Sequence, residues 1–301
     1  MYQSFFGLQE APFSLTPDTR YFYPCPSSQA ALNVLLVALA SGEGFVKVVG
    51  DVGTGKTMLC RQILDLLGDS FMLAYLPNPL LSPPELYRAI GMEWGLPWPT
   101  TTGLQEYLLS LTQHLEQAAR QGKKAALLVD EAQSLPTETL EALRLLTNLE
   151  TQRHKVIQVA LFAQPELERR LLTTQGRALH QRITFSYTLA GLQREDVPPY
   201  LHHRLRTAGW QGESLFSHAA LAEMAQASRG IPRLINIITH KALMSAYGEG
   251  SKEIHRRHVM LAVADTEAAG PSLPWWQLAW LGLRGGWRQA MAPSPLPLHQ
   301  P

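Results

Sequence analysis

The chain has 301 residues, a formal net charge of +1 and 46% hydrophobic residues. This composition is typical of a folded globular protein and excludes a disordered chain. The near-neutral charge argues against a protein that works on nucleic acid, which needs a strongly basic surface. Two cysteines, Cys25 and Cys60, are too few for a disulfide framework and favour a reducing, cytoplasmic setting.

The first two thirds of the chain alternate between apolar runs and helical patterns. Residues 1–44 predict an entry segment rich in aromatic residues and prolines, which ends in a helix from about residue 27 to 41. Residues 45–190 predict an α/β core, a parallel sheet with helices on both faces. The predicted strands are 45–49, 71–76, 125–129, 156–162 and 183–189, of which 45–49 and 125–129 are apolar runs that suit buried parallel strands.

The pattern changes after residue 190. Residues 191–266 show helical periods and no strand, which predicts a smaller helical domain that closes as a lid over the core. Residues 267–301 form a tail rich in proline and tryptophan. Within it, the tryptophans and arginines of 273–288 suit a membrane interface, a partner groove or disorder equally well. No apolar run reaches the roughly 20 residues that span a bilayer.

The segment Gly50–Thr57, GDVGTGKT, matches the phosphate-binding pattern G-x-x-x-x-G-K-[ST] between a predicted strand and a predicted helix. Glycines let successive backbone N–H groups face phosphate oxygens, and the helix adds the positive end of its dipole. We expect the Lys56 ammonium to reach the β- and γ-phosphates and the Thr57 hydroxyl to ligate Mg2+. The expected nucleotide-binding residues are Gly50, Asp51, Val52, Gly53, Thr54, Gly55, Lys56, Thr57 and Met58.

A second motif follows the third predicted strand, where an apolar run ends in Asp130 and Glu131. Asp130 is expected to hold Mg2+ together with Thr57. Glu131 is expected to polarise the attacking water as general base. The two motifs together predict that ATP and Mg2+ bind and that ATP is hydrolysed.

These motifs and the helical lid resemble the AAA+ ATPases. Further stretches are similar to the ExeA-type ATPases of general (type II) secretion, and among them to those of mannose-sensitive haemagglutinin (MSHA) pilus biogenesis. The resemblance covers residues 1 to about 265. The stretches are Phe6–Leu8, Pro12–Phe13, Pro17–Asp18, Gly42–Phe45, Leu143–Glu150, Gln164–Leu167, Gln181–Ile183 and Gly230–Arg233.

The resemblance implies roles for four more residues. Gln164, after the fourth strand, matches sensor 1, which orients the lytic water. Arg233, in Gly-Ile-Pro-Arg, matches sensor 2, a lid arginine that touches the γ-phosphate. Arg182 matches an arginine finger offered to a neighbouring subunit, and Arg177 is the alternative. A finger that acts in trans implies self-association as a ring or a dimer.

The resemblance also implies partners among pilus or type II secretion assembly proteins. It implies a cytoplasmic location, with peripheral inner-membrane contact through 273–288 as an option. Nucleic acid is disfavoured as a partner. Two other functions remain open: a DNA-acting AAA+ ATPase of the transposition or initiator kind, and a nucleotide-dependent adaptor with little hydrolysis.

Two smaller features have competing interpretations. Tyr21 or Phe22 could pack on the adenine base, although anchoring the entry segment to the core explains these aromatics as well. His255 and His258 form H-x-x-H, but no third ligand lies nearby in sequence. We interpret the histidine pair as part of a solvated helix face.

Overall fold

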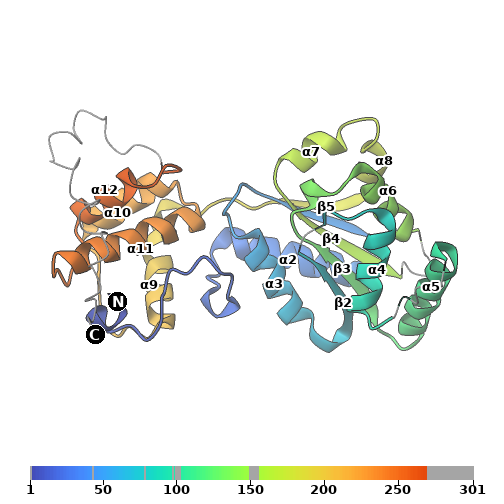
Figure 1. The fold of residues 1–301 in the computed structure, drawn as a ribbon, viewed down its shortest axis with the longest axis horizontal. Coiled ribbons are helices and arrows are strands. Elements are labelled where there is room, and N and C mark those ends of the chain that lie inside the picture. The colour runs from blue at the N-terminus through green and yellow to red at the C-terminus, as the bar shows by residue number, and fades with distance from the viewer. Residues whose placement is uncertain are drawn as a thin grey trace, which may run out of the picture.

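The computed structural model describes residues 2–42, 44–77, 79–96, 98, 103–148 and 156–269. They form two lobes, one built around a sheet and one built of helices (Figure 1). The segment 273–288 lies outside the described residues, so the sequence-based expectations for it stay predictions. Within the described part of the chain, no helix has both the length and the apolar character needed to cross a membrane.

The sheet has five parallel strands in the order β2-β3-β4-β1-β5. All five predicted strands are confirmed to within one residue at each end. Because the strands are parallel, their carboxyl ends meet at one edge, where loops converge on ligands in folds of this kind. The strands are β1 (Phe45–Val49), β2 (Phe71–Leu76), β3 (Lys124–Val129), β4 (Ile157–Ala163) and β5 (Ile183–Thr188).

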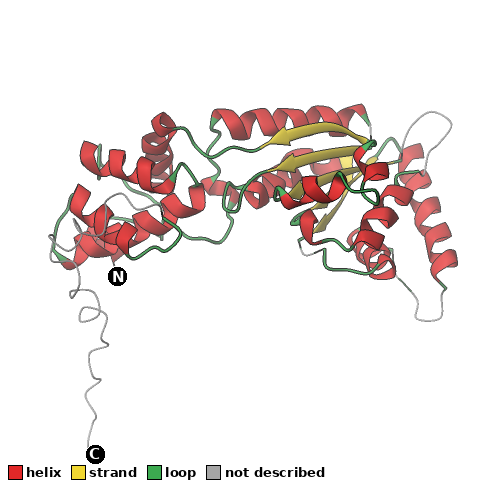
Figure 2. Ribbon diagram, turned by 90° about the horizontal axis from the view of Figure 1, so that it is seen from above, coloured by secondary structure: helices red, strands yellow, loops and turns green. Residues whose placement is uncertain are grey.

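Helices cover both faces of the sheet, which explains why its central strands are buried along their whole length and mostly apolar (Figures 1 and 2). One face packs on α2 (Pro26–Ser41) and α3 (Lys56–Leu67) through side chains such as Val48 and Leu128. The other face packs through side chains such as Leu127 and Val159. Its helices are α4 (Pro83–Glu93), α5 (Leu104–Arg120), α6 (Thr137–Leu146), α7 (Glu166–Leu171) and α8 (Arg177–His180).

The helical lobe contains four main helices and part of the entry segment. The helices are α9 (Val197–Thr207), α10 (His218–Ser228), α11 (Pro232–Gly248) and α12 (Arg256–Ala264).

Short 3-10 turns occur in both parts of the chain, at η1 (Thr19–Tyr21), η2 (Gly68–Ser70), η3 (Ala132–Ser134) and η4 (Arg194–Asp196).

The aromatic residues of the entry segment anchor it, but mostly to the helical lobe and not to the sheet. Tyr2 and Phe6 of α1 (Tyr2–Phe6), together with Phe13 and Tyr21, are buried in the hydrophobic core of that lobe. Arg204 of α9 joins them: its Nε donates to the carbonyl oxygen of Pro12 at 2.6 Å, and its guanidinium lies 4.7 Å from the Tyr21 ring centroid. Opposite ends of the described chain therefore share one core.

The interpretation of His255 and His258 as a solvated face is wrong for His258, which is fully buried. Its Nδ1 accepts a hydrogen bond from the His255 backbone N–H, 3.1 Å away, and so caps α12. Its Nε2 lies 3.0 Å from Oε2 of Glu249. Among the described residues no group of three potential metal ligands occurs, and the pair serves as a helix cap.

Candidate functional site

The loop between β1 and α3 has the tight curl that its glycines predict. Gly53 and Gly55 have φ of 84° and 103°, in the left-handed region that favours glycine. The Thr54 hydroxyl donates to the carbonyl oxygen of Asp51 at 2.9 Å and closes the turn. The Gly50 backbone N–H donates to the Ala163 carbonyl at the end of β4, 3.1 Å away. The loop is therefore fixed to the carboxyl edge of the sheet.

Lys56 begins α3 and is buried at the base of this loop. Its Nζ donates to the carbonyl oxygens of Gly50 at 2.7 Å and Asp51 at 2.9 Å. Burial lowers the pKa of Lys56, and the nearby carboxylates of Glu131 and Asp130 partly oppose that shift. The ammonium thus lies where the first and third strands end.

Thr57 and Asp130 meet directly, although 73 positions separate them in the chain. The Thr57 hydroxyl donates to Oδ2 of Asp130 at 2.6 Å, and the Asp130 backbone N–H donates to the Leu76 carbonyl at the end of β2. Burial raises the pKa of Asp130, and the hydrogen bond from Thr57 opposes that rise. A hydroxyl and a carboxylate side by side are the hard oxygen ligands that Mg2+ prefers, so these residues fit the ion.

Glu131 follows Asp130 with φ of 51° and ψ of 37°, a left-handed conformation that is uncommon for a non-glycine residue. Its Oε2 accepts hydrogen bonds from Nε2 of Gln133 at 2.5 Å and from Nε2 of Gln164 at 3.0 Å. Gln164 comes directly after β4, so two strand ends meet here. Sequence reasoning gave Gln133 no role, although it lies two positions after Glu131.

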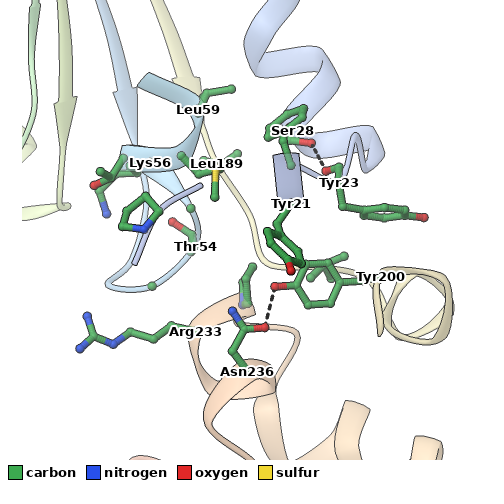
Figure 3. A pocket seen from close by; sticks show the side chains of 18 of the residues that line it. Tyr21, Tyr23, Ser28, Thr54, Lys56, Leu59, Leu189, Tyr200, Arg233 and Asn236 are labelled. Carbon is green, nitrogen blue, oxygen red and sulfur yellow. Dashed lines mark hydrogen bonds between the residues drawn. The ribbon is translucent and has the colours of Figure 1, made fainter. Parts of the chain in front are cut away.

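The helical lobe touches the phosphate loop at Arg233. The Arg233 backbone N–H donates to the Gly53 carbonyl oxygen at 3.2 Å, and a Cβ at Gly53 would lie only 2.7 Å from the Cβ of Arg233. Pro232 stands at the first position of α11 and sets this approach. The exposed Arg233 side chain runs past the loop on the side of Lys56 (Figure 3).

A pocket opens between the loop and the helical lobe. Its walls include Gly53–Leu59, Glu131 and Arg233, and on the far side Tyr21, Tyr200 and Asn236 (Figure 3). The Tyr200 hydroxyl donates to Oδ1 of Asn236 at 2.8 Å, and both side chains are buried. This fixes the amide of Asn236, whose nitrogen lies on the side of the phosphate loop (Figure 3). Tyr21 both lines the pocket and packs in the helical lobe; Phe22 also lines the pocket.

Arg182 and Arg177 lie away from this pocket. Ile183 pairs with Phe45, the first residue of β1, so Arg182 stands at the amino edge of the sheet. The five residues of β1 separate it from the phosphate loop, a span of about 16 Å. Arg177 starts α8 and is exposed. The structure therefore does not bring either arginine into the site of its own chain.

The fold and the site together define a class of protein. A parallel sheet carries a phosphate loop after β1, an acidic pair after β3 and a polar residue after β4, with a helical lobe beside them: this is an AAA+ P-loop protein. Residues 39–171 match the family model described as AAA domain.

Solved structures of other proteins share this fold. Cdc6p of Pyrobaculum aerophilum is 19% identical, with a TM-score of 0.65 over 84% of this chain and 70% of that one. Drosophila ORC bound to DNA is 19% identical, with a TM-score of 0.61 over 85% of this chain and 66% of that one. At such identities the likeness concerns the fold alone.

The narrower assignment comes from a sequence relative. General secretion pathway protein A of Aeromonas hydrophila is 41% identical over 275 residues, which is 91% of this chain. The chain belongs with it to the ExeA type of AAA+ proteins. It spans half the length of that relative.

Proposed function

We propose that this chain binds MgATP and hydrolyses it to drive conformational change in a secretion or pilus assembly apparatus. The observation that carries the proposal is the 2.6 Å contact between the Thr57 hydroxyl and Asp130 beside the buried Lys56. It places a phosphate-binding loop and an acidic strand end at one point, as nucleotide hydrolysis requires.

Each group at this edge has a chemical task. Lys56 and the backbone N–H groups of the loop bind the phosphates, and Thr57 and Asp130 hold Mg2+. When bound, the ion would neutralise part of the negative charge of the phosphates. Glu131 takes a proton from the attacking water as general base, and Gln164 holds Glu131 in place. Arg233 binds the γ-phosphate from the helical lobe.

The far side of the pocket suits the nucleoside. Tyr21 offers an aromatic face, and the Asn236 amide, fixed by Tyr200, offers a donor toward the ring nitrogens of a purine. These two residues come from the entry segment and the helical lobe, which share one core. Base binding and phosphate binding therefore draw on different parts of the chain.

The first test measures Mg2+-dependent ATP binding by calorimetry and steady-state ATPase activity. Glu131→Gln keeps the shape of the side chain but removes the base, so ATP binding persists and turnover falls by about 100- to 10,000-fold. Glu138→Gln, the same change on an exposed side chain at the start of α6, leaves both unchanged. Turnover of Glu131→Gln equal to that of the parent would refute the assignment.

A second test concerns assembly. Arg182 lies at the sheet edge opposite the phosphate loop, which suits a finger that completes a neighbouring subunit's site. Mixing inactive Arg182→Ala with inactive Lys56→Ala restores part of the ATPase, because one kind of interface then combines an intact loop with an intact finger. The same mixture made with Arg177→Ala tests the alternative finger. If neither mixture regains activity, the site is complete within one chain.

The secretion or pilus role rests on the relative's name, general secretion pathway protein A. The narrower MSHA pilus role rests on the resemblance of the stretches quoted above. Inner-membrane contact through 273–288 is tested by co-sedimentation with vesicles, with and without residues 270–301; equal sedimentation removes that contact from the proposal.

The two other functions have distinct signatures. A DNA-acting ATPase would bind DNA with an affinity that falls steeply as salt rises. A nucleotide-dependent adaptor would bind ATP tightly yet show no turnover at any protein concentration, with or without membranes. Either result would replace hydrolysis-driven assembly as the function.

A further inference from the structure

Gln133 is a polar residue beside the proposed general base, and the proposed roles above leave it without a task. We infer that Gln133 is a positioning residue that holds the Glu131 carboxylate for the hydrolytic step, an inference that rests on the proposed ATPase function. Gln133 makes three contacts that hold this arrangement, and Glu131 has a backbone conformation that needs support.

The first contact is with Glu131 itself. Nε2 of Gln133 donates to Oε2 of Glu131 at 2.5 Å, and Nε2 of Gln164 donates to the same oxygen at 3.0 Å. Both donors therefore meet one carboxylate oxygen. Among the described residues no hydrogen bond reaches the other oxygen, Oε1, which keeps its lone pairs for a water molecule.

The second contact fixes which end of the Gln133 amide faces Glu131. Oε1 of Gln133 accepts from the Gln164 backbone N–H at 3.0 Å. A backbone N–H needs an acceptor and an ionised carboxylate needs a donor. A carboxamide meets both demands from one side chain, whereas an ionised carboxylate has no hydrogen to donate, so glutamine suits this position and glutamate does not.

The third contact anchors the backbone of Gln133. Nη1 of Arg170, on α7, donates to the Gln133 carbonyl oxygen at 2.6 Å. Gln133 thus ties η3 to the segment that follows β4 through its side chain and its main chain. A side chain that is itself held by hydrogen bonds can hold its neighbour in place, because it has little conformational freedom left to lose when it does so.

Glu131 requires such support. Its left-handed backbone conformation is unfavourable for a residue with a Cβ and persists only where the surroundings hold it. A general base must also lie within hydrogen-bond reach of the water it deprotonates. Displacement of a catalytic group by about 1 Å can lower a rate by about 100-fold, so the hydrogen bonds of Gln133 matter for turnover.

The test compares Gln133→Met and Gln133→Glu with the parent. Methionine keeps the length and removes both polar contacts; glutamate keeps the acceptor for Gln164 but puts a second carboxylate against Glu131. Both variants are expected to lower kcat by about 10- to 100-fold while the Kd for MgATP changes less than about twofold. Ser134→Ala, in the same 3-10 turn, is the matched control and keeps both values.

Three outcomes are decisive. A kcat equal to the parent's in both variants overturns the inference and leaves the ATPase proposal intact, whereas a parent without turnover overturns both. Gln133→Glu retains the contact with the Gln164 backbone. If its Kd for MgATP rises as much as its kcat falls, Gln133 is a structural residue of the pocket and not a positioning residue for Glu131. In single-turnover assays, Gln133→Met added to Glu131→Gln should cause no further loss, because the group it positions has already been removed.

Discussion

The two ends of the nucleotide pocket are built differently. The phosphate end comes from the sheet lobe, where the ends of β1, β3 and β4 bring Lys56, Asp130 and Gln164 together. The base end comes from two segments far apart in sequence, with Tyr21 from the entry segment and Asn236 from α11. Parallel strands fix their carboxyl ends by backbone pairing, so the phosphate end is set by the sheet itself.

The base end depends on packing in the helical lobe. The helical lobe contacts the phosphate loop at Arg233. Arg233 contacts Gly53 there through one backbone hydrogen bond and close van der Waals contact. A change in the lobe can therefore move the base end while the phosphate end stays in place. Closure and release of the nucleotide should act through this junction.

The largest expected effect belongs to the phosphate end. Lys56→Ala removes a buried cation that is directed at the phosphates, and ATP affinity should fall by at least about 10- to 100-fold. Lys47→Ala is the matched control: Lys47 is also buried, lies on β1 and pairs with Glu168 at 2.5 Å. Calorimetry should show near-parental affinity for Lys47→Ala, with a lower Tm. Similar losses of affinity in both variants would mean that burial, and not the loop, determines binding.

The second-largest effect on ATP affinity is expected at the contact between Gly53 and Arg233. Gly53→Ala forces a left-handed alanine and places its Cβ 2.7 Å from that of Arg233, so the helical lobe should move away from the loop and ATP affinity should fall about tenfold. Gly122→Ala carries the same kind of strain at φ of 78° with open space around the Cβ. Both variants should lose about 1–2 kcal/mol of stability. Only Gly53→Ala should bind ATP more weakly and be cut faster by protease between the lobes.

A smaller effect is expected at the base end. Asn236→Leu removes the proposed donor to the purine, so ATP affinity should fall by about three- to tenfold while inorganic tripolyphosphate binds as before. Asn33→Leu, on an exposed position of α2, serves as control. Calorimetric titrations with both ligands would separate the two ends of the pocket. If Asn236→Leu lost as much affinity for tripolyphosphate as for ATP, the separation of the pocket into a base end and a phosphate end would be wrong.

The smallest expected effect is the pH-dependent contribution of Asp130 to stability. Burial raises its pKa, so the folded protein binds this proton more tightly than the unfolded chain does. The carboxyl group therefore contributes most to stability below its ordinary range near about 3.9, and that contribution is lost as pH rises through the raised value. Asp130→Asn, which mimics the neutral form, should have a slightly higher Tm at pH 7 without nucleotide.

Thermal unfolding between pH 4 and 8 would check this sign. The difference in Tm between Asp130→Asn and the parent should close as the pH falls. The same variant should lose the Mg2+ dependence of ATP binding. A parent that is more stable than Asp130→Asn at pH 7 would show that the hydrogen bond from Thr57 outweighs the cost of burying the charge.

The sequence by itself determined the sheet and the two motifs at its edge. Runs of five to seven residues rich in apolar and β-branched side chains predicted the strands, and the spacing of glycines before Lys56 required one loop conformation. These signals are local: burial on both faces dictates the apolar runs, and left-handed φ angles dictate glycine.

The tertiary structure alone decided what lies between distant segments. Packing placed the entry segment in the helical core, buried His258 as a cap, and set Gln133 against Glu131 and Gln164. None of these contacts follows from spacing along the chain, because each depends on which surfaces meet after the strands have paired and the lobes have packed.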